Sequence, residues 1–175
     1  YPYMVTVKMP LPTSEKPFFL PSEMEGAHLN PHKLTDHRPS HHERHHPSPL
    51  HLLSLGNPHA VTFNTEAYSK REQLASIWSP AFEEGVNLSF GQFISPTEIT
   101  LHVHERGCGW TRGCGTGACA TAYTAVKIGL SPLNVPILIH LPGGDLTIEV
   151  SERALEMSGE AIEVFTGTLS SNLLL

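Results

Sequence analysis

The chain has 175 residues and a mass of 19.2 kDa, which is enough for one domain with a hydrophobic core or for two small lobes. Its net charge of −6 offers no broad basic surface for nucleic acid, and no apolar run has the length of a membrane span. The three cysteines are an odd number, which argues against a disulfide framework and indicates a reducing, cytoplasmic environment. We therefore expect neither a nucleic-acid partner nor a membrane partner.

The N-terminal segment Tyr3–Met9 alternates in polarity and is rich in β-branched residues, which predicts a strand. Between residues 11 and 50 proline is frequent, apolar residues are sparse, and eight of the twelve histidines lie from His28 to His51. This composition predicts a long, mostly irregular linker. The chain begins with Tyr1 rather than Met, so we do not expect its first residue to be the start of a gene.

A histidine cluster, His41–His46, stands inside this linker. Histidines four residues apart could share one face of a helix and bind a metal ion. Pro39, Pro47 and Pro49 oppose such a helix, and no cysteine or carboxylate is spaced as a further ligand. The cluster is therefore interpreted as a solvated polar segment, and no metal site is predicted.

A compact domain is predicted after residue 50. Strands over 51–55 and 60–63 flank a turn at Gly56–His59, and Thr65 is expected to cap a helix over 66–78. A glycine-rich segment then leads into an alanine-rich helix that ends near residue 129. The remaining predicted strands are 86–94, 98–104, 135–140, 145–150, 155–158 and 161–165. Many strands around one alanine-rich helix predict an α+β lobe wrapped around that helix.

Cys114 is the strongest candidate for a catalytic residue. It stands where the glycine-rich loop enters the helix, so unpaired N–H groups and the positive end of the helix dipole should surround it. This setting favours the thiolate, and we expect it to bring the pKa of Cys114 down toward neutrality. The backbone of Gly115, Thr116 and Gly117 can approach an anion closely. A thiolate beside a carboxylate-binding helix end is suited to removing the α-proton of an amino acid, because N–H donors stabilise the enolate-like charge.

Other interpretations of the same segment are weaker or remain open. The Gly-Thr-Gly sequence is a weak hint of a phosphate loop, but the lysine of a Walker motif is absent. No C-x-x-C pair indicates zinc, and Cys108 and Cys119 are expected to pack rather than react. From the residues alone, Cys114 could still be a buried structural thiol, and His59 could be a turn residue that caps nearby backbone.

Three motifs in order carry a resemblance to a known family. Glu105–Ala120 closely resembles the second catalytic-cysteine signature of diaminopimelate epimerase, and Gly56–His59 resembles its Gly-Asn-Pro-His turn. Asn87–Phe90 resembles a strand motif of the same family, and segments 141–144 and 157–161 resemble its C-terminal part. The resemblance extends over residues 53–165 and implies a mixed or antiparallel, barrel-like sheet around a central helix.

The resemblance implies a cofactor-independent epimerase that interconverts LL- and meso-diaminopimelate for lysine and peptidoglycan-precursor synthesis. Such an enzyme has one catalytic thiol in each of two pseudo-symmetric lobes, and Cys114 would be the acid or base on one face of the α-carbon. Gly115 and Thr116 would give backbone donors to the carboxylate at the reacting centre. Glu105 would bind the distal ammonium and pair with His59 near the thiol. The distal carboxylate would be held by Asn57, Asn87 and Arg106.

One departure from the family pattern changes the expectation. No Asn-x-x-Cys-Gly-Asn loop of the first lobe occurs, and no cysteine precedes Gly56. Trp110 also replaces a glutamate common in the family, which we regard as tolerable. The chain is therefore interpreted as four parts: the last strand of a missing first lobe (1–10), a linker (11–50), the C-terminal lobe (51–166) and a tail returning toward the missing lobe (167–175).

The expected partner is a first-lobe segment that carries the second cysteine, because inversion requires an acid on the face opposite the base. The chain alone should have little or no epimerase activity. Exposed strand edges at Tyr3–Val7 and in the tail could also produce a homodimer. The alternatives are another isomerase of the same fold, such as a proline racemase-like enzyme, and a non-catalytic lobe that serves as an interaction module.

Overall fold

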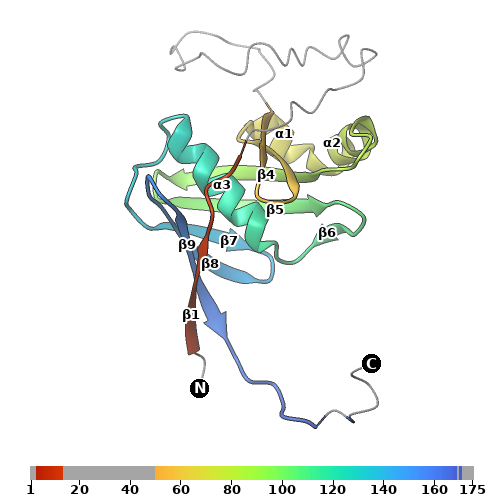
Figure 1. Cartoon of the computed structure of the whole chain (residues 1–175). Coiled ribbons are helices and arrows are strands. Elements are labelled where there is room, and N and C mark those ends of the chain that lie inside the picture. The colour runs from red at the N-terminus through yellow and green to blue at the C-terminus, as the bar shows by residue number, and fades with distance from the viewer. Residues whose placement is uncertain (1–2, 14–49, 169, 171–175) are drawn as a thin grey trace.

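The computed structural model describes residues 3–13, 50–168 and 170, and in this part of the chain nine strands form one mixed sheet (Figure 1). The strand order is β1-β9-β8-β7-β5-β4-β3-β2, with β6 paired to β5. The β3–β4 and β5–β7 pairs are parallel and the other pairs are antiparallel. The α+β fold around one central helix is confirmed. The strand order begins at β1 and ends at β2, and an antiparallel bridge between Thr13 and Ser54, with both N–H···O distances at 2.8 Å, connects the segment after β1 to β2.

The sheet and the helices account for most of residues 50–161. The strands are β1 Tyr3–Met9, β2 His51–Ser54, β3 Pro58–Thr62, β4 Asn87–Ser95, β5 Glu98–Glu105, β6 Gly109–Thr111, β7 Ile137–Leu141, β8 Gly144–Val150 and β9 Leu155–Ala161. The helices are α1 Thr65–Ser69, α2 Arg71–Trp78, the 3₁₀ turn η3 Ser79–Ala81 and α3 Gly115–Lys127.

The structure corrects several expectations about local elements. Pro58 and His59, predicted as part of a turn over Gly56–His59, are the first two residues of β3. The helix predicted over 66–78 is divided into α1 and α2 at Lys70, and its cap is Asn64, whose Oδ1 accepts a hydrogen bond from Ala67 N at 2.8 Å. Asparagine is at least as good a cap as the predicted Thr65, so the helix begins one residue earlier. Strand β6 lies within the segment predicted as a loop, and the strand predicted over 161–165 is wrong because β9 ends at Ala161.

Some expectations fall outside the described residues. These are most of the linker, including His41–His46, and the last five residues of the tail. The division of the chain into four parts therefore stays a prediction.

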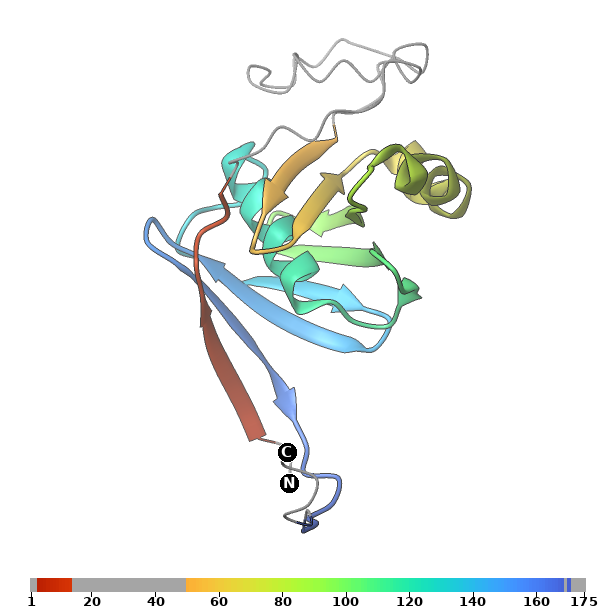
Figure 2. The same cartoon turned by 45° about the vertical axis from the view of Figure 1, so that its right-hand side comes forward.

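Helix α3 lies against one face of the sheet, as Figure 2 shows, and its alanines make close packing possible. Ala118, Ala122 and Ala125 are fully buried in one cluster with the branched side chains of β5, β7 and β8. Small side chains let the helix backbone approach the sheet, and interiors of this kind are close-packed. The position of the start of α3 is thereby fixed relative to the end of β5.

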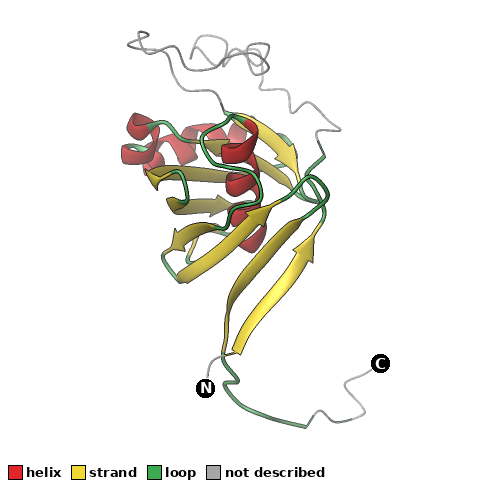
Figure 3. Cartoon of the chain, turned by 90° about the vertical axis from the view of Figure 1, so that its left-hand side faces the viewer, coloured by secondary structure: helices red, strands yellow, loops and turns green. Residues whose placement is uncertain are grey.

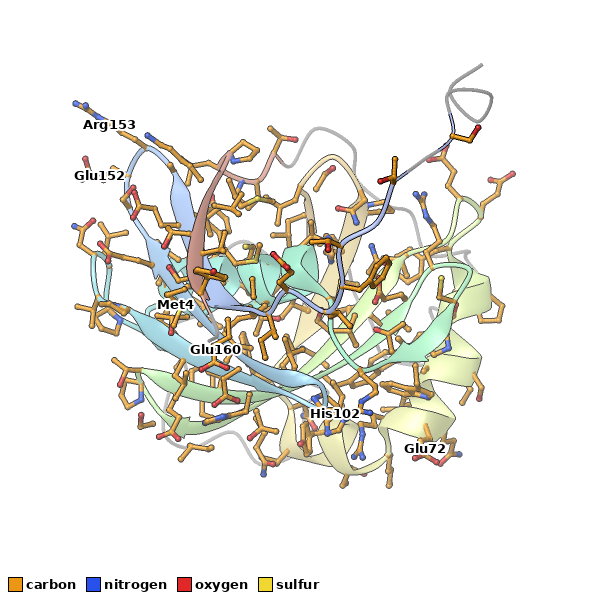
Figure 4. All side chains as sticks on the ribbon, turned by 90° about the horizontal axis from the view of Figure 1, so that it is seen from below. Met4, Glu72, His102, Glu152, Arg153 and Glu160 are labelled. Carbon is orange, nitrogen blue, oxygen red and sulfur yellow. The ribbon has the colours of Figure 1, made fainter. Side chains whose placement is uncertain are left out.

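The other face of the sheet is covered over β4 by α1 and α2. The indole of Trp78 stacks on Phe90 at 5.8 Å between ring centroids, and Tyr68 contacts His102 edge-on at 5.7 Å. Figure 4 shows His102 at this helix-covered side. Because β4 and β5 are packed from both sides, the residues at their ends, Asn87 and Glu105, have a rigid support.

Strands β1 and β9 form an arm that extends beyond the rest of the sheet (Figure 3). On one face of β1, Tyr3, Val5 and Val7 are 65%, 45% and 43% exposed. The opposite face is more polar: Met4 pairs with Glu160, which Figure 4 shows side by side, and Thr6 Oγ1 and Ser158 Oγ are hydrogen-bonded at 2.7 Å. The arm therefore has an apolar face that no described residue covers fully.

The packing of α3 leads to a prediction about stability. Replacing Ala122 by Leu should destabilise the fold by about 1–3 kcal/mol, because the fully buried site has no room for three more carbons. Urea unfolding monitored by circular dichroism measures this change. Gln73→Leu, on the exposed surface of α2, is the matched control and should change stability by less than about 0.5 kcal/mol. Equal effects of the two substitutions would contradict the tight packing of α3.

Candidate active site

Cys114 is the N-cap of α3. Its backbone is extended (φ −139°, ψ 103°), and its Sγ accepts a hydrogen bond from Gly117 N at 3.3 Å. The Thr116 hydroxyl lies 3.6 Å from the same sulfur. The thiol is 7% exposed. The predicted placement at the start of the alanine-rich helix is thus confirmed, with two donors aimed at the sulfur.

Close contacts leave little room for a side chain at the glycines next to the cysteine. A Cβ at Gly117 would lie 3.1 Å from both Cys114 Sγ and Val103 Cγ2, and a Cβ at Gly115 would lie 3.0 Å from Met157 Sδ. A side chain at Gly117 would therefore push the thiol away from its donor. The glycine spacing in the sequence reflects this crowding between α3, β5 and β9.

A chain of side-chain hydrogen bonds connects His59 with the thiol. His59 Nε2 and Asn57 Oδ1 are 3.0 Å apart, and Asn57 Nδ2 donates to Thr116 Oγ1 at 3.3 Å. Thr116 Oγ1 in turn faces Cys114 Sγ. The turn between β2 and β3 and the first turn of α3 are thereby held together. Four of the predicted site residues, from segments more than fifty positions apart, lie in one network.

Glu105 is at the end of β5, and its Oε1 accepts a hydrogen bond from the Thr111 hydroxyl. The carboxylate acts electrostatically on both Cys114 and His59. The expected direct pairing of Glu105 with His59 is not what the structure shows, because the histidine is bonded to Asn57. Glu105 instead acts on Cys114, whose pKa its carboxylate raises.

Asn87 and Arg106 connect strands rather than project freely into the site. Asn87 is 4% exposed, donates from Nδ2 to Pro58 O at 2.9 Å and accepts from Arg106 N at 3.0 Å. The Arg106 guanidinium donates to Glu84 O at 3.3 Å. The Asn87 amide thus ties the starts of β3 and β4 to the end of β5. The predicted role of these residues in holding a distal carboxylate remains a prediction.

The pKa of Cys114 corrects the expectation drawn from the helix dipole. Burial raises the pKa of this thiol above its ordinary value, and the charge of Glu105 acts in the same direction. The hydrogen bonds from Thr116 and Gly117 lower it but do not outweigh the burial. The expected shift toward neutrality is therefore wrong. The resting group is a protonated thiol beside a carboxylate, which is suited to donating a proton and needs help to become a base.

The start of α3 also leaves backbone donors for a ligand. The first N–H groups of a helix have no acceptor within the helix. In α3, Gly117 N donates to the sulfur and Ala118 N donates to Cys114 O. The N–H groups of Gly115 and Thr116 therefore remain next to the thiol, where an anion could bind.

His59 is fully buried, and burial lowers its pKa to about 4, although the charge of Glu105 acts to raise it. Its Nδ1 atom has no hydrogen-bond partner in the described part of the chain. With Nε2 bonded to the Asn57 carbonyl oxygen, the neutral ring carries its proton on Nε2 and keeps Nδ1 as an acceptor. At neutral pH this imidazole is therefore uncharged, and its Nδ1 carries no proton.

The other cysteines differ from each other. Cys119 is buried as expected, and burial raises its pKa to about 12. Cys108 was expected to pack but is exposed, because Gly107 and Gly109, with φ of 78° and 76°, form a tight turn that leaves it at the tip. No group of three metal-ligating side chains occurs among residues 3–13, 50–168 and 170.

Two residues near the thiol were missed at the level of the sequence. Thr111 bonds Glu105, and Met157 of β9 borders the backbone of Gly115. Thr111 lies in the short strand β6, which begins with a glycine and follows a glycine-rich segment. The sequence pattern therefore did not predict a strand there. Met157 is forty-three positions from Cys114, and only the sheet order brings the two segments together.

The structure is that of an α+β protein with a cysteine at the N-cap of its central helix. Comparison with known proteins then identifies the family. The sequence model of diaminopimelate epimerase matches residues 51–168. The chain therefore belongs to the diaminopimelate epimerase family. None of the helices in the described ranges is long and apolar enough to cross a membrane.

The individual relatives are similar over a limited part of their length. The chain is 39% identical over 126 residues to the diaminopimelate epimerase of Halothermothrix orenii and 42% identical over 127 residues to that of Methanothermobacter thermautotrophicus. These alignments cover 69% of this chain but 43% and 44% of the relatives, so the chain spans less than half the length of the curated relatives it matches.

Two solved structures show a partial likeness to the chain. A predicted epimerase from Pseudomonas aeruginosa superposes with a TM-score of 0.47 at 15% identity, over 68% of this chain and 46% of that one. A phenazine biosynthesis protein from Bacillus anthracis superposes with a TM-score of 0.42 at 19% identity, over 53% and 30% of the two chains.

The burial of His59 predicts a pH dependence of stability. Its pKa is lower in the folded chain than in the unfolded one, so the unfolded state binds more protons between about pH 4 and pH 6.5 and stability falls on acidification through that range. Going from about pH 7 to about pH 5 should remove about 2 kcal/mol through this group. Urea unfolding of the wild type and of His59→Gln measures the effect, which the variant should lack.

His140 provides a control of opposite sign. Glu98 and Asp145 flank its ring at 2.9 and 2.8 Å and raise its pKa, so its contribution is present at low pH and lost as pH rises through the folded pKa. His140→Gln should therefore make the acid destabilisation steeper, whereas His59→Gln should make it shallower. A His59→Gln protein with the wild-type pH dependence would contradict a buried neutral imidazole.

Proposed function

We propose that this chain supplies one catalytic face of a cofactor-independent, two-base diaminopimelate epimerase, in which Cys114 exchanges a proton with the α-carbon. The observation that carries the proposal is the thiol at the start of α3, which stands next to the N–H groups of Gly115 and Thr116 and whose pKa the Glu105 carboxylate raises. Membership of the family supports the substrate class.

The chemistry follows from the charges at the site. When Cys114 acts as base, Glu105 first accepts the thiol proton, and the thiolate then removes the α-proton to form an S–H bond. The electron pair left on carbon is delocalised into the substrate carboxylate, which the N–H groups of Gly115 and Thr116 stabilise. In the reverse direction the thiol donates its proton to the carbanion. The high pKa of a buried thiol favours this donor state.

Substrate recognition at the distal end is proposed for Asn57, Asn87 and Arg106. The backbone-directed hydrogen bonds of Asn87 indicate that it acts mainly by fixing the position of Arg106 N and the turn before β3. Arg106, bonded by a single 3.3 Å contact to Glu84 O, has donors available for a carboxylate. Glu105 serves the thiol and is available to a substrate ammonium.

Inversion requires a second acid or base on the opposite face of the α-carbon, and we propose that a first lobe supplies it. The apolar face of the arm fits such a lobe, because Val7 pairs with Met157 and Met157 borders Gly115 beside the thiol. A protein surface packed on this face would therefore reach the catalytic helix end. A non-catalytic interaction module would use the same face without needing the thiol network, and that network favours the enzyme.

The activity is tested with diaminopimelate in deuterated water. The chain alone should give little or no inversion of LL-diaminopimelate, because a single thiol returns the proton to the face from which it came. Addition of the first lobe of the Methanothermobacter thermautotrophicus relative should restore inversion. Replacing Cys114 by Ala should then lower the rate by about 10²–10⁴-fold, the usual contribution of acid–base catalysis. Chiral chromatography and mass spectrometry measure inversion and deuterium uptake.

Cys119→Ala is the matched control, because this thiol is fully buried and its pKa of about 12 keeps it protonated. Strong turnover by the 175-residue chain alone would contradict the need for a second lobe. An aziridine analogue of diaminopimelate gives a second readout: covalent labelling of Cys114 only when the first lobe is added supports an assembled site. No labelling in any mixture would favour the interaction module.

The apolar face of the arm is tested by binding. Val5→Gln should weaken association with the added first lobe by about tenfold, because it places an unpaired amide on the apolar face. Met4→Gln changes the opposite face of the same strand, where the side chain is 69% exposed, and should have little effect. Isothermal titration calorimetry measures both constants. Equal loss in the two variants would show that the lobe does not pack on that face, and concentration-dependent sedimentation of the chain alone reveals a homodimer.

A further inference from the structure

Thr111 lies beside the candidate site without belonging to the predicted set. It is the last residue of β6, and it stands directly opposite Val103 in the antiparallel pair with β5. Opposite residues, and residues two apart on one strand, share a face of a sheet. Thr111 therefore shares with Val103 and Glu105 the face that packs against α3.

This face is continuous with the core cluster that contains the thiol. Val103 belongs to the cluster that contains Cys114 and Ala118, and its Cγ2 borders the same point at Gly117 as the sulfur does. Glu105 is diagonal to Thr111 across the strand pair, within reach of a short side chain. The Thr111 hydroxyl uses this position to donate a hydrogen bond to Glu105 Oε1.

We propose that Thr111 is a positioning residue, which holds the Glu105 carboxylate toward the Cys114 thiol. The hydroxyl occupies one carboxylate oxygen and limits rotation of the side chain, so the other oxygen remains available to the thiol proton. Glu105 is the final residue of β5, and the chain after it turns at Gly107 and Gly109. Apart from the facing thiol, no other side chain in the described residues bonds this carboxylate. The inference deepens the proposed function, since it assigns a support to the same acid–base pair.

The consequence concerns the ionisation of Cys114. As long as the carboxylate faces the sulfur, its charge opposes formation of the thiolate. Without the Thr111 hydroxyl the carboxylate can turn toward solvent, where its charge is screened. The thiol should then ionise at a lower pH, although the catalytic pair is less well aligned.

The test is the pH profile of alkylation of Cys114 by iodoacetamide in the whole chain, without substrate or first lobe. Thr111→Val and Thr111→Ala should shift the profile to lower pH and raise the rate near neutrality by about threefold. Glu105→Gln should shift it in the same direction and at least as far, because the charge is removed. Thr111→Ser keeps the hydroxyl and should restore the wild-type profile. Cleavage after Arg112 and Lys127 separates the peptide 113–127 from Cys108, and fragment spectra distinguish Cys119.

Thr100→Val is the matched control on β5, since the Thr100 hydroxyl has no hydrogen bond among the described residues and should leave the profile unchanged. A wild-type profile for Thr111→Val and Thr111→Ala alongside a shifted Glu105→Gln would overturn the inference. An unshifted Glu105→Gln would overturn it as well, because the carboxylate would then not face the thiol. The experiment measures the ionisation of Cys114 and not turnover. Its outcome is therefore independent of whether the chain has epimerase activity.

Discussion

The site depends on one physical conflict, the burial of an ionisable sulfur at the positive end of a helix. The N-cap position gives Cys114 the donors of Gly117 and Thr116, which favour the thiolate. Packing between α3, β5 and β9 removes water from the sulfur and favours the thiol, and the nearby carboxylate adds to this effect. Burial wins in the resting protein. A positive charge near the sulfur would shift the balance toward the thiolate, and the proton exchange proposed for Cys114 would use both states.

The rigidity of this arrangement comes from polar groups buried in the sheet. The Asn87 amide bridges the backbone of two separated segments, and the Asn57 amide bridges His59 and Thr116. Removing one partner from such a buried network leaves another group unsatisfied, which costs about 1–3 kcal/mol. Much of the candidate site is therefore also structural. Substitutions of these asparagines would change the position of the helix start together with any contact to a ligand.

Local signals in the sequence identified the position of Cys114 at the helix start, a turn at Gly56 and Asn57, and the strand 98–104, because each depends on neighbouring residues alone. The direction of the thiol pKa was missed for the opposite reason. The Gly-Thr-Gly sequence indicates a helix start and hence the effect of the helix dipole. Val103 and Met157 pack at this helix start and contribute to the burial that outweighs the dipole, but only the order of the strands brings them there. The pairing of His59 with Asn57 rather than Glu105, and the strand β6 that carries Thr111, likewise depend on the register between strands.

The same register connects the unpartnered arm with the chemistry. Val7 stands opposite Met157 on the apolar face of the β1–β9 pair, and Met157 contacts the first residue of α3 next to the thiol. A surface that covers this face would remove water from the helix end at the same time as it buries Val5 and Val7. In a less polar surrounding, the hydrogen bonds from the helix N–H groups to a substrate carboxylate become stronger. Assembly and catalysis would therefore be coupled through the side chains of Val5, Val7 and Met157. The proposed carboxylate site is accordingly expected to bind weakly until the arm is covered.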